Sequence, residues 1–119
     1  MFINLSNHPY EKWNQKQLDM AKQYGDIVNI PFPAISPYAS SDDIDHLVAE
    51  YEKKIKQYDE PVVMLQGEYI FTYRLVSRLK KEDIKVLASC SDRRTIEYID
   101  DDGYTKRESV FEFVEFKEY

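Results

Sequence analysis

Short apolar runs alternate with segments of helical periodicity along the first ninety residues. The apolar runs predict strands at residues 2–6, 26–30, 61–65 and 84–89. Between them, apolar side chains recur every three or four residues, which predicts helices from about residues 14 to 24, 41 to 58 and 68 to 81. This alternation is typical of a mostly parallel sheet wrapped by helices.

Local signals mark where the predicted helices and loops begin. Ser41 is the expected N-cap of the second helix, because Asp42 and Asp43 follow it in the first turn. Gly25 is the expected stop of the first helix. The three prolines between residues 31 and 37 predict a stiff extended loop after the second strand.

The pattern changes after residue 94. Two strand-like runs, Thr95 to Ile99 and Ser109 to Phe116, flank an Asp-Asp-Asp-Gly turn and predict a β-hairpin. Strict alternation in the second run puts Phe111 and Phe113 on one face and Val110, Val114 and Phe116 on the other. The expected fold is therefore α/β: a Rossmann-like, mostly parallel sheet of order β-α-β-α-β-α-β with a C-terminal antiparallel hairpin. Residues 1–119 form a single domain.

Composition and charge limit the partners. A net charge of −6 argues against binding long nucleic acids, which requires neutralising many phosphates. All five arginines lie in the second half of the chain, so a small anionic ligand in one local pocket is compatible with this charge. Cys90 is the single cysteine, and no segment has the pattern of a signal peptide or of a membrane span. A cytoplasmic protein without a membrane partner is expected.

The candidate site lies where the predicted parallel strands end, because ligands of open α/β sheets bind outside the carboxyl ends of the strands. These ends are Ser6 to His8, Pro31 to Pro33 around Phe32, Gln66 to Glu68, and Ser89 to Arg94. Gln66 and Gly67 also open a helix, whose backbone N–H groups can receive a phosphate.

Each candidate has a functional and a purely structural interpretation. His8 can act as a general acid or base, or it can be a solvated loop residue. Gly67 can let a ligand approach the backbone, or it can simply permit a tight turn. Arg93 and Arg94 can clamp phosphate, or they can pair with Asp92 and the acidic hairpin.

Several familiar motifs are absent. The chain has no GxxxxGK[ST], GxGxxG, HExxH or GxSxG sequence. The run Asp100 to Asp102 lacks the alternating ligands of a calcium loop, so a solvated turn is expected there. We therefore expect no cofactor and no metal ion.

Four short motifs suggest a family. They are Ser6–Pro9, Gln66–Glu68, Ser91–Arg93 and the closing segment Phe111–Tyr119. Together they resemble the small stand-alone CRISPR-associated Rossmann-fold (CARF-like) accessory proteins of type III CRISPR systems. Glu115 departs from this resemblance, because the family commonly has a basic residue in the closing strand.

The resemblance implies binding of a cyclic oligoadenylate, the tetra-adenylate ring, by a homodimer that takes part in antiviral defence. By this resemblance, Asn7 and His8 lie near a scissile phosphate and its ribose, and Arg93 stabilises charge. His8 and Arg93 are the catalytic candidates. The ligand-binding candidates are Ser6, Asn7, Phe32, Gln66, Gly67, Glu68, Ser89, Ser91 and Arg94.

Three hypotheses for function follow. The first is a metal-independent ring nuclease, in which a ribose 2′-hydroxyl attacks the neighbouring phosphodiester. The second is a non-catalytic sponge that sequesters the same messenger. The third is a plain interaction module that pairs its aromatic C-terminal edge, Tyr104 and Phe111 to Phe116, with a partner strand.

Overall fold

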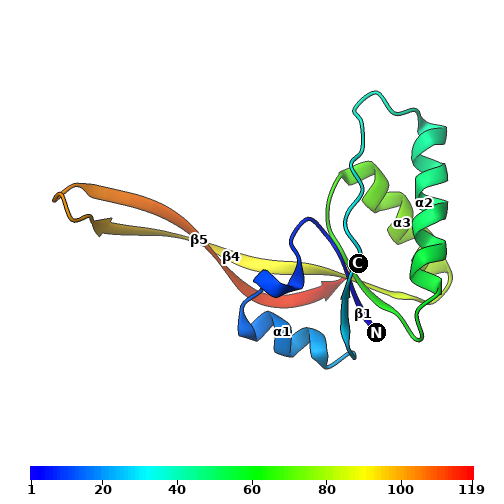
Figure 1. The fold of residues 1–119 in the computed structure, drawn as a ribbon, viewed down its shortest axis with the longest axis horizontal. Coiled ribbons are helices and arrows are strands. Elements are labelled where there is room, and N and C mark those ends of the chain that lie inside the picture. Colours follow the sequence, from blue (N-terminus) through cyan, green and yellow to red (C-terminus); the bar gives the residue numbers. More distant parts are fainter.

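A computed structural model describes all 119 residues and shows a five-stranded sheet with helices on both faces (Figure 1). The strand order is β2-β1-β3-β4-β5, in which every neighbouring pair is parallel except the antiparallel pair β4–β5. The elements are β1 (Phe2–Leu5), a 3-10 turn (Tyr10–Lys12), α1 (Gln15–Lys22), β2 (Ile27–Asn29), α2 (Ser41–Lys56), β3 (Val62–Leu65), α3 (Tyr69–Lys81), β4 (Lys85–Ile99) and β5 (Thr105–Glu118). The predicted α/β fold with a C-terminal hairpin is confirmed.

The sheet is buried on both faces by two separate apolar clusters. Ile3, Leu5 and Leu65 point to the larger cluster, which α2 and α3 cover. Their neighbours Phe2 and Met64 point to the smaller cluster, which α1 covers. This alternation along each strand explains why the central strands read as continuous apolar runs.

The start of α2 differs by one residue from the prediction. Ser40, not Ser41, is the N-cap: its hydroxyl accepts from the Asp43 backbone N–H, and the Asp43 carboxylate accepts from the Ser40 N–H. The hydrogen bonds from Ser40 hold the pKa of Asp43 below its usual value. Ser40 is the N-cap because it lies three residues before Asp43. At this spacing each side chain can accept from the other residue's backbone N–H.

Strand β4 does not end at Ser89 as predicted. It continues to Ile99, and β5 pairs with it from Leu87 to Ile99. The expected loop of Ser89 to Arg94 is therefore strand, because the apolar run of β5 provides cross-strand partners for these polar residues. None of α1, α2 and α3 combines the length and the hydropathy of a membrane-spanning helix.

A β-bulge sets the faces of β5. Cys90 stands opposite Glu115 and Ser91 opposite Phe113, which leaves Val114 as the extra residue. Phe113 and Phe116 consequently share one face, with ring centroids 4.9 Å apart, and Phe116 packs on Phe2. The prediction that these two phenylalanines lie on opposite faces is wrong, because it assumed an unbroken pleat.

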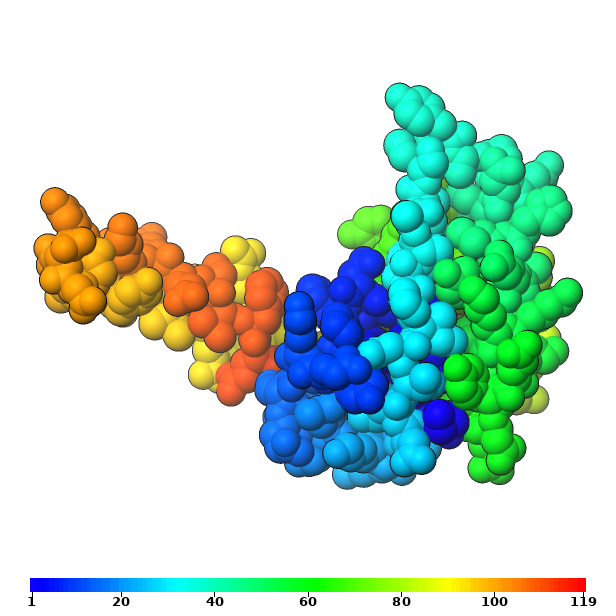
Figure 2. Space-filling model, viewed as in Figure 1, coloured from blue at the N-terminus to red at the C-terminus, as the bar shows by residue number.

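Beyond the bulge, β4 and β5 leave the body as a two-stranded ribbon, here called the arm, residues 92–112 (Figures 1 and 2). The radius of gyration is 17.1 Å, against about 13.5 Å expected for a compact chain of this length. The arm carries the exposed apolar side chains Ile96, Tyr98, Ile99, Tyr104, Val110 and Phe111.

Candidate functional site

A groove of about 790 Å³ lies at the carboxyl ends of β1, β3 and β4, on the face that α1 covers. Strand order reverses between β1 and β3, so the groove lies at the switch point where open α/β sheets bind ligands. Its lining residues are Ser6, Asn7, His8, Lys12, Trp13, Asn14, Gln17, Met64, Gln66, Gly67, Ser89, Ser91, Phe111 and Phe113. Seven of the eleven candidate residues therefore come together in it.

The loop after β1 is held by a buried asparagine. Asn4 is only 2 % exposed, and its Nδ2 donates to the His8 carbonyl at 2.8 Å and to Asn29 Oδ1 at 2.9 Å. Its Oδ1 accepts from the Ser6 hydroxyl at 2.7 Å. Asn29 in turn accepts from the backbone N–H of Tyr10. The Asn4–Asn29 bond joins β1 to β2, and the other bonds tie these strands to the loop, so the main chain of His8 has a fixed position.

The backbone of His8 is held by hydrogen bonds, whereas its imidazole is not. The side chain is exposed and lines the groove, and no hydrogen bond or ion pair engages its ring nitrogens. A rigid backbone with an unengaged imidazole is what a general acid or base needs in order to meet a ligand proton.

Gln66 is largely occupied by the protein itself. Its Oε1 accepts from the Ser89 backbone N–H at 2.9 Å, and its Nε2 donates to the Ser89 carbonyl at 3.2 Å. The amide thus extends the pairing between β3 and β4 after β3 has ended. Gln66 lines the groove, but its main role in this geometry is to hold Ser89 in place.

The N-terminus of α3 is already satisfied by Glu68. Its carboxylate accepts from the backbone N–H groups of Ile70 at 2.9 Å and Phe71 at 2.8 Å. A carboxylate at this position compensates the positive end of the helix dipole. A phosphate at the same helix end would meet this negative charge, so the helix-terminus route to anion binding has little support.

Gly67 is explained by packing. A Cβ built on Gly67 would lie 2.2 Å from Cε2 of Phe32, whose ring packs edge-on against Phe71 with centroids 5.2 Å apart. Phe32 itself is part of the core margin and does not line the groove. The glycine therefore makes room for a phenylalanine of the proline-rich loop.

This contact predicts a stability effect. Gly67→Ala should lower the free energy of unfolding by about 1–3 kcal/mol, because the added methyl overlaps the Phe32 ring. In a Phe32→Ala background the same substitution should cost less than about 1 kcal/mol, because the ring is gone. Urea unfolding of the four chains measures both values. Equal costs in the two backgrounds would contradict the packing explanation.

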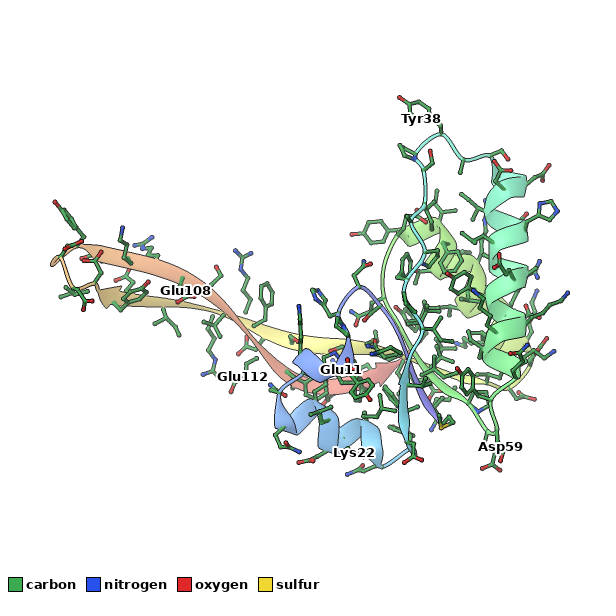
Figure 3. All side chains as sticks on the ribbon, in the orientation of Figure 1. Glu11, Lys22, Tyr38, Asp59, Glu108 and Glu112 are labelled. Atoms are coloured by element: carbon green, nitrogen blue, oxygen red, sulfur yellow. The ribbon has the colours of Figure 1, made fainter.

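The two candidate arginines have different contacts. Arg93 stands opposite Phe111, with its guanidinium carbon 5.9 Å from the ring centroid, and donates to Ser109 Oγ. Since Phe111 lines the groove, Arg93 lies one side chain away from it. Arg94 pairs with Asp92 and Glu112, the residue labelled at the base of the arm in Figure 3. Arg94 follows the structural interpretation.

Several groove residues were not among the candidates. Lys12, Trp13, Asn14 and Gln17 come from the turn and helix after β1, and Phe111 comes from the arm. Lys12 supplies a cation and the two aromatic rings supply flat apolar surface. Asn4, which holds the loop after β1, was also missed. It could have been found from the sequence, because it is the one polar residue within the β1 run Phe2–Leu5.

The groove has no metal-binding character. No three His, Cys, Asp or Glu side chains lie close enough together in this structure to hold a metal ion. Its polar groups are amides, hydroxyls, one imidazole and one ammonium. Such groups donate hydrogen bonds to phosphate and ribose oxygens, and the nearby aromatic rings can stack with bases.

Comparison with known proteins finds one family model. The model described as "Uncharacterized protein MJ1673 family" matches residues 1–117. No curated protein and no solved structure matches the chain. The chemistry of the groove is therefore the basis on which a function can be argued.

Proposed function

This chain belongs to the MJ1673 family, and from its groove we propose that it binds a cyclic oligoadenylate, the tetra-adenylate ring, and opens it without a metal ion. The observation that carries the proposal is the convergence of Ser6, Asn7, His8, Ser89 and Ser91 on one groove at the sheet's switch point. The groove offers donors to a phosphodiester and aromatic rings to its bases.

The proposed reaction is an internal transesterification. The ribose 2′-oxygen attacks the neighbouring phosphorus as the bond from phosphorus to the 5′-oxygen breaks. His8 accepts the 2′-hydroxyl proton, and the departing 5′-oxygen is protonated by His8 or by water. The products are a 2′,3′-cyclic phosphate and a 5′-hydroxyl, so no oxidant or cofactor is needed.

Each residue has a distinct part in this reaction. The Asn4 network fixes the backbone of His8, so the imidazole can be placed beside the 2′-hydroxyl whose oxygen attacks in line with the scissile bond. Two cations are available: Lys12 lines the groove, and Arg93 lies over the ring of the groove residue Phe111. Either one can stabilise charge on the phosphoryl oxygens. With one acid–base side chain in the groove, turnover is expected to be slow.

We also propose that the protein acts as a homodimer joined through the arm. An isolated two-stranded ribbon is at best marginally stable in water. Here β5 is the last strand of the sheet order, so its outer edge is unpaired, and large apolar side chains on the arm are exposed. A second copy can pair with the same edge around a two-fold axis, because such an interface uses identical patches.

The function is tested by incubating the purified protein with labelled cyclic tetra-adenylate in the presence of EDTA and separating the products by chromatography. Linear products ending in a 2′,3′-cyclic phosphate are expected. If the ring is bound tightly but stays intact, the protein sequesters the messenger and does not open it. If the ring neither binds nor raises the melting temperature, both messenger functions fail and the interaction module is favoured.

A further inference from the structure

A second cavity of about 510 Å³ lies beside α3, and none of the residues given a part in the reaction above lines it. It is lined by Gln66, Gly67, Tyr69, Thr72, Tyr73, Val76 and Tyr119, and we call it the tyrosine cleft. None of these side chains carries a formal charge at neutral pH. Three of the seven are tyrosines, so aromatic rings form a large part of its walls.

One wall of the tyrosine cleft is rigid. The Tyr119 hydroxyl donates to the Leu65 carbonyl at 2.7 Å, and its backbone N–H donates to the Val86 carbonyl at 3.0 Å. Lys80 Nζ donates to the Tyr119 main-chain oxygen at 2.7 Å. Burial raises the pKa of Tyr119, whose hydroxyl is protonated at neutral pH even without this shift and acts as a donor. The ring is thus fixed before any ligand arrives.

The other wall is exposed and unpartnered. Tyr69 and Tyr73 are 89 % and 75 % exposed, and they lie one helical turn apart on the same side of α3. Between the walls, Thr72 is 9 % exposed and its hydroxyl has no hydrogen-bond partner. A buried hydroxyl without a partner is uncommon. Thr72 lines the cavity as a residue, while its hydroxyl oxygen has almost no accessible surface.

The tyrosine cleft adjoins the groove. Gln66 and Gly67 line both cavities, so the two meet where β3 ends. The groove opens toward α1 and the cleft toward α3, so a ligand can cross the edge of the sheet from one to the other. Phosphate is disfavoured on the α3 side by the Glu68 carboxylate, whereas an uncharged ring is not.

We propose that the tyrosine cleft binds a purine base of the ligand whose phosphodiester lies in the groove. This inference rests on the proposed function, because the base belongs to the cyclic oligoadenylate proposed there. A planar, uncharged heteroaromatic ring matches the aromatic walls formed by Tyr69, Tyr73 and Tyr119. The base held there then sets the position of the phosphate that faces His8.

The test compares adenosine 5′-monophosphate with ribose 5-phosphate, which has the same phosphate and no base. The wild-type protein should bind the first about 5- to 150-fold more tightly, the range expected for stacking of one base. Tyr69→Ala and Tyr73→Ala should reduce this preference to near unity. Tyr38→Ala is the matched control, because Tyr38 is 95 % exposed at the tip of the loop before α2 (Figure 3) and should keep the full preference.

The outcomes separate this inference from the proposed function. If the preference is absent, or survives both tyrosine substitutions in folded variants, the tyrosine cleft does not hold a base, even if cyclic tetra-adenylate binds tightly. If cyclic tetra-adenylate fails to bind while the preference exists and depends on Tyr69 and Tyr73, the cleft is supported and the proposed function fails. Circular dichroism confirms that each variant is folded.

Discussion

His8→Ala should slow the opening of cyclic tetra-adenylate by at least about a hundredfold, the usual loss when a positioned proton-transfer group is removed. Affinity for the intact ring should change little, because the amides and hydroxyls of the groove remain. The loop should keep its shape, since Asn4 bonds to the backbone carbonyl of His8 and not to its ring. Single-turnover assays with excess protein measure the rate, and calorimetry measures the affinity.

His46→Ala is the matched control, because His46 is the only other histidine and lies exposed on α2. It should leave the rate unchanged. Added imidazole should partly restore the rate of His8→Ala and not affect His46→Ala. A His8→Ala protein that opens the ring at the wild-type rate would remove His8 from the mechanism. A variant that loses affinity and rate equally would make His8 a binding residue.

Shortening the arm should convert the proposed arm-joined dimer to a monomer. Replacing residues 96–108 with Asn-Gly joins Thr95 to Ser109, which are cross-strand partners, through a tight type I′ turn. The change removes Ile96, Tyr98 and Tyr104 but keeps the groove residue Phe111. Light scattering coupled to size exclusion at micromolar concentration reports the mass, and the affinity for the ring should fall with the dimer.

A point variant separates lost contacts from an altered hairpin. Ile96→Ser with Tyr98→Ser keeps the arm at full length and should also give a monomer, because these two side chains project from one face of the ribbon. Tyr38→Ser removes an exposed aromatic side chain from the body and not from the arm, so this variant should remain dimeric. A shortened protein that stays dimeric would exclude the arm as the interface.

The body of the fold could be predicted because its signals are local. Apolar runs marked all three short parallel strands, and the periodic positions Ile44, Val48 and Ile55 marked the buried side of α2. The arm could not be predicted in the same way. The polar residues from Ser91 to Arg94 read as a loop, and only their pairing with β5 makes them strand.

The candidate site was predicted in part for the same reason. The rule about strand ends located Ser6 to His8 and Gln66 to Gly67, since it depends on topology alone. It did not reveal that Glu68 would satisfy its own helix or that Phe32 would fill the space over Gly67. Those outcomes depend on side-chain contacts between segments distant in sequence.

The extra residue at Val114 has a consequence for how this protein can vary. The bulge bends β5 but keeps Phe111 and Phe113 on the same face as Phe116. The direction of the arm can therefore change without changing which side chains of β5 face the body. Insertions at the distal turn would lengthen the ribbon without changing what faces Trp13. Restoring a regular pleat with Val114 in place would instead turn Phe113 outward and empty one wall of the groove.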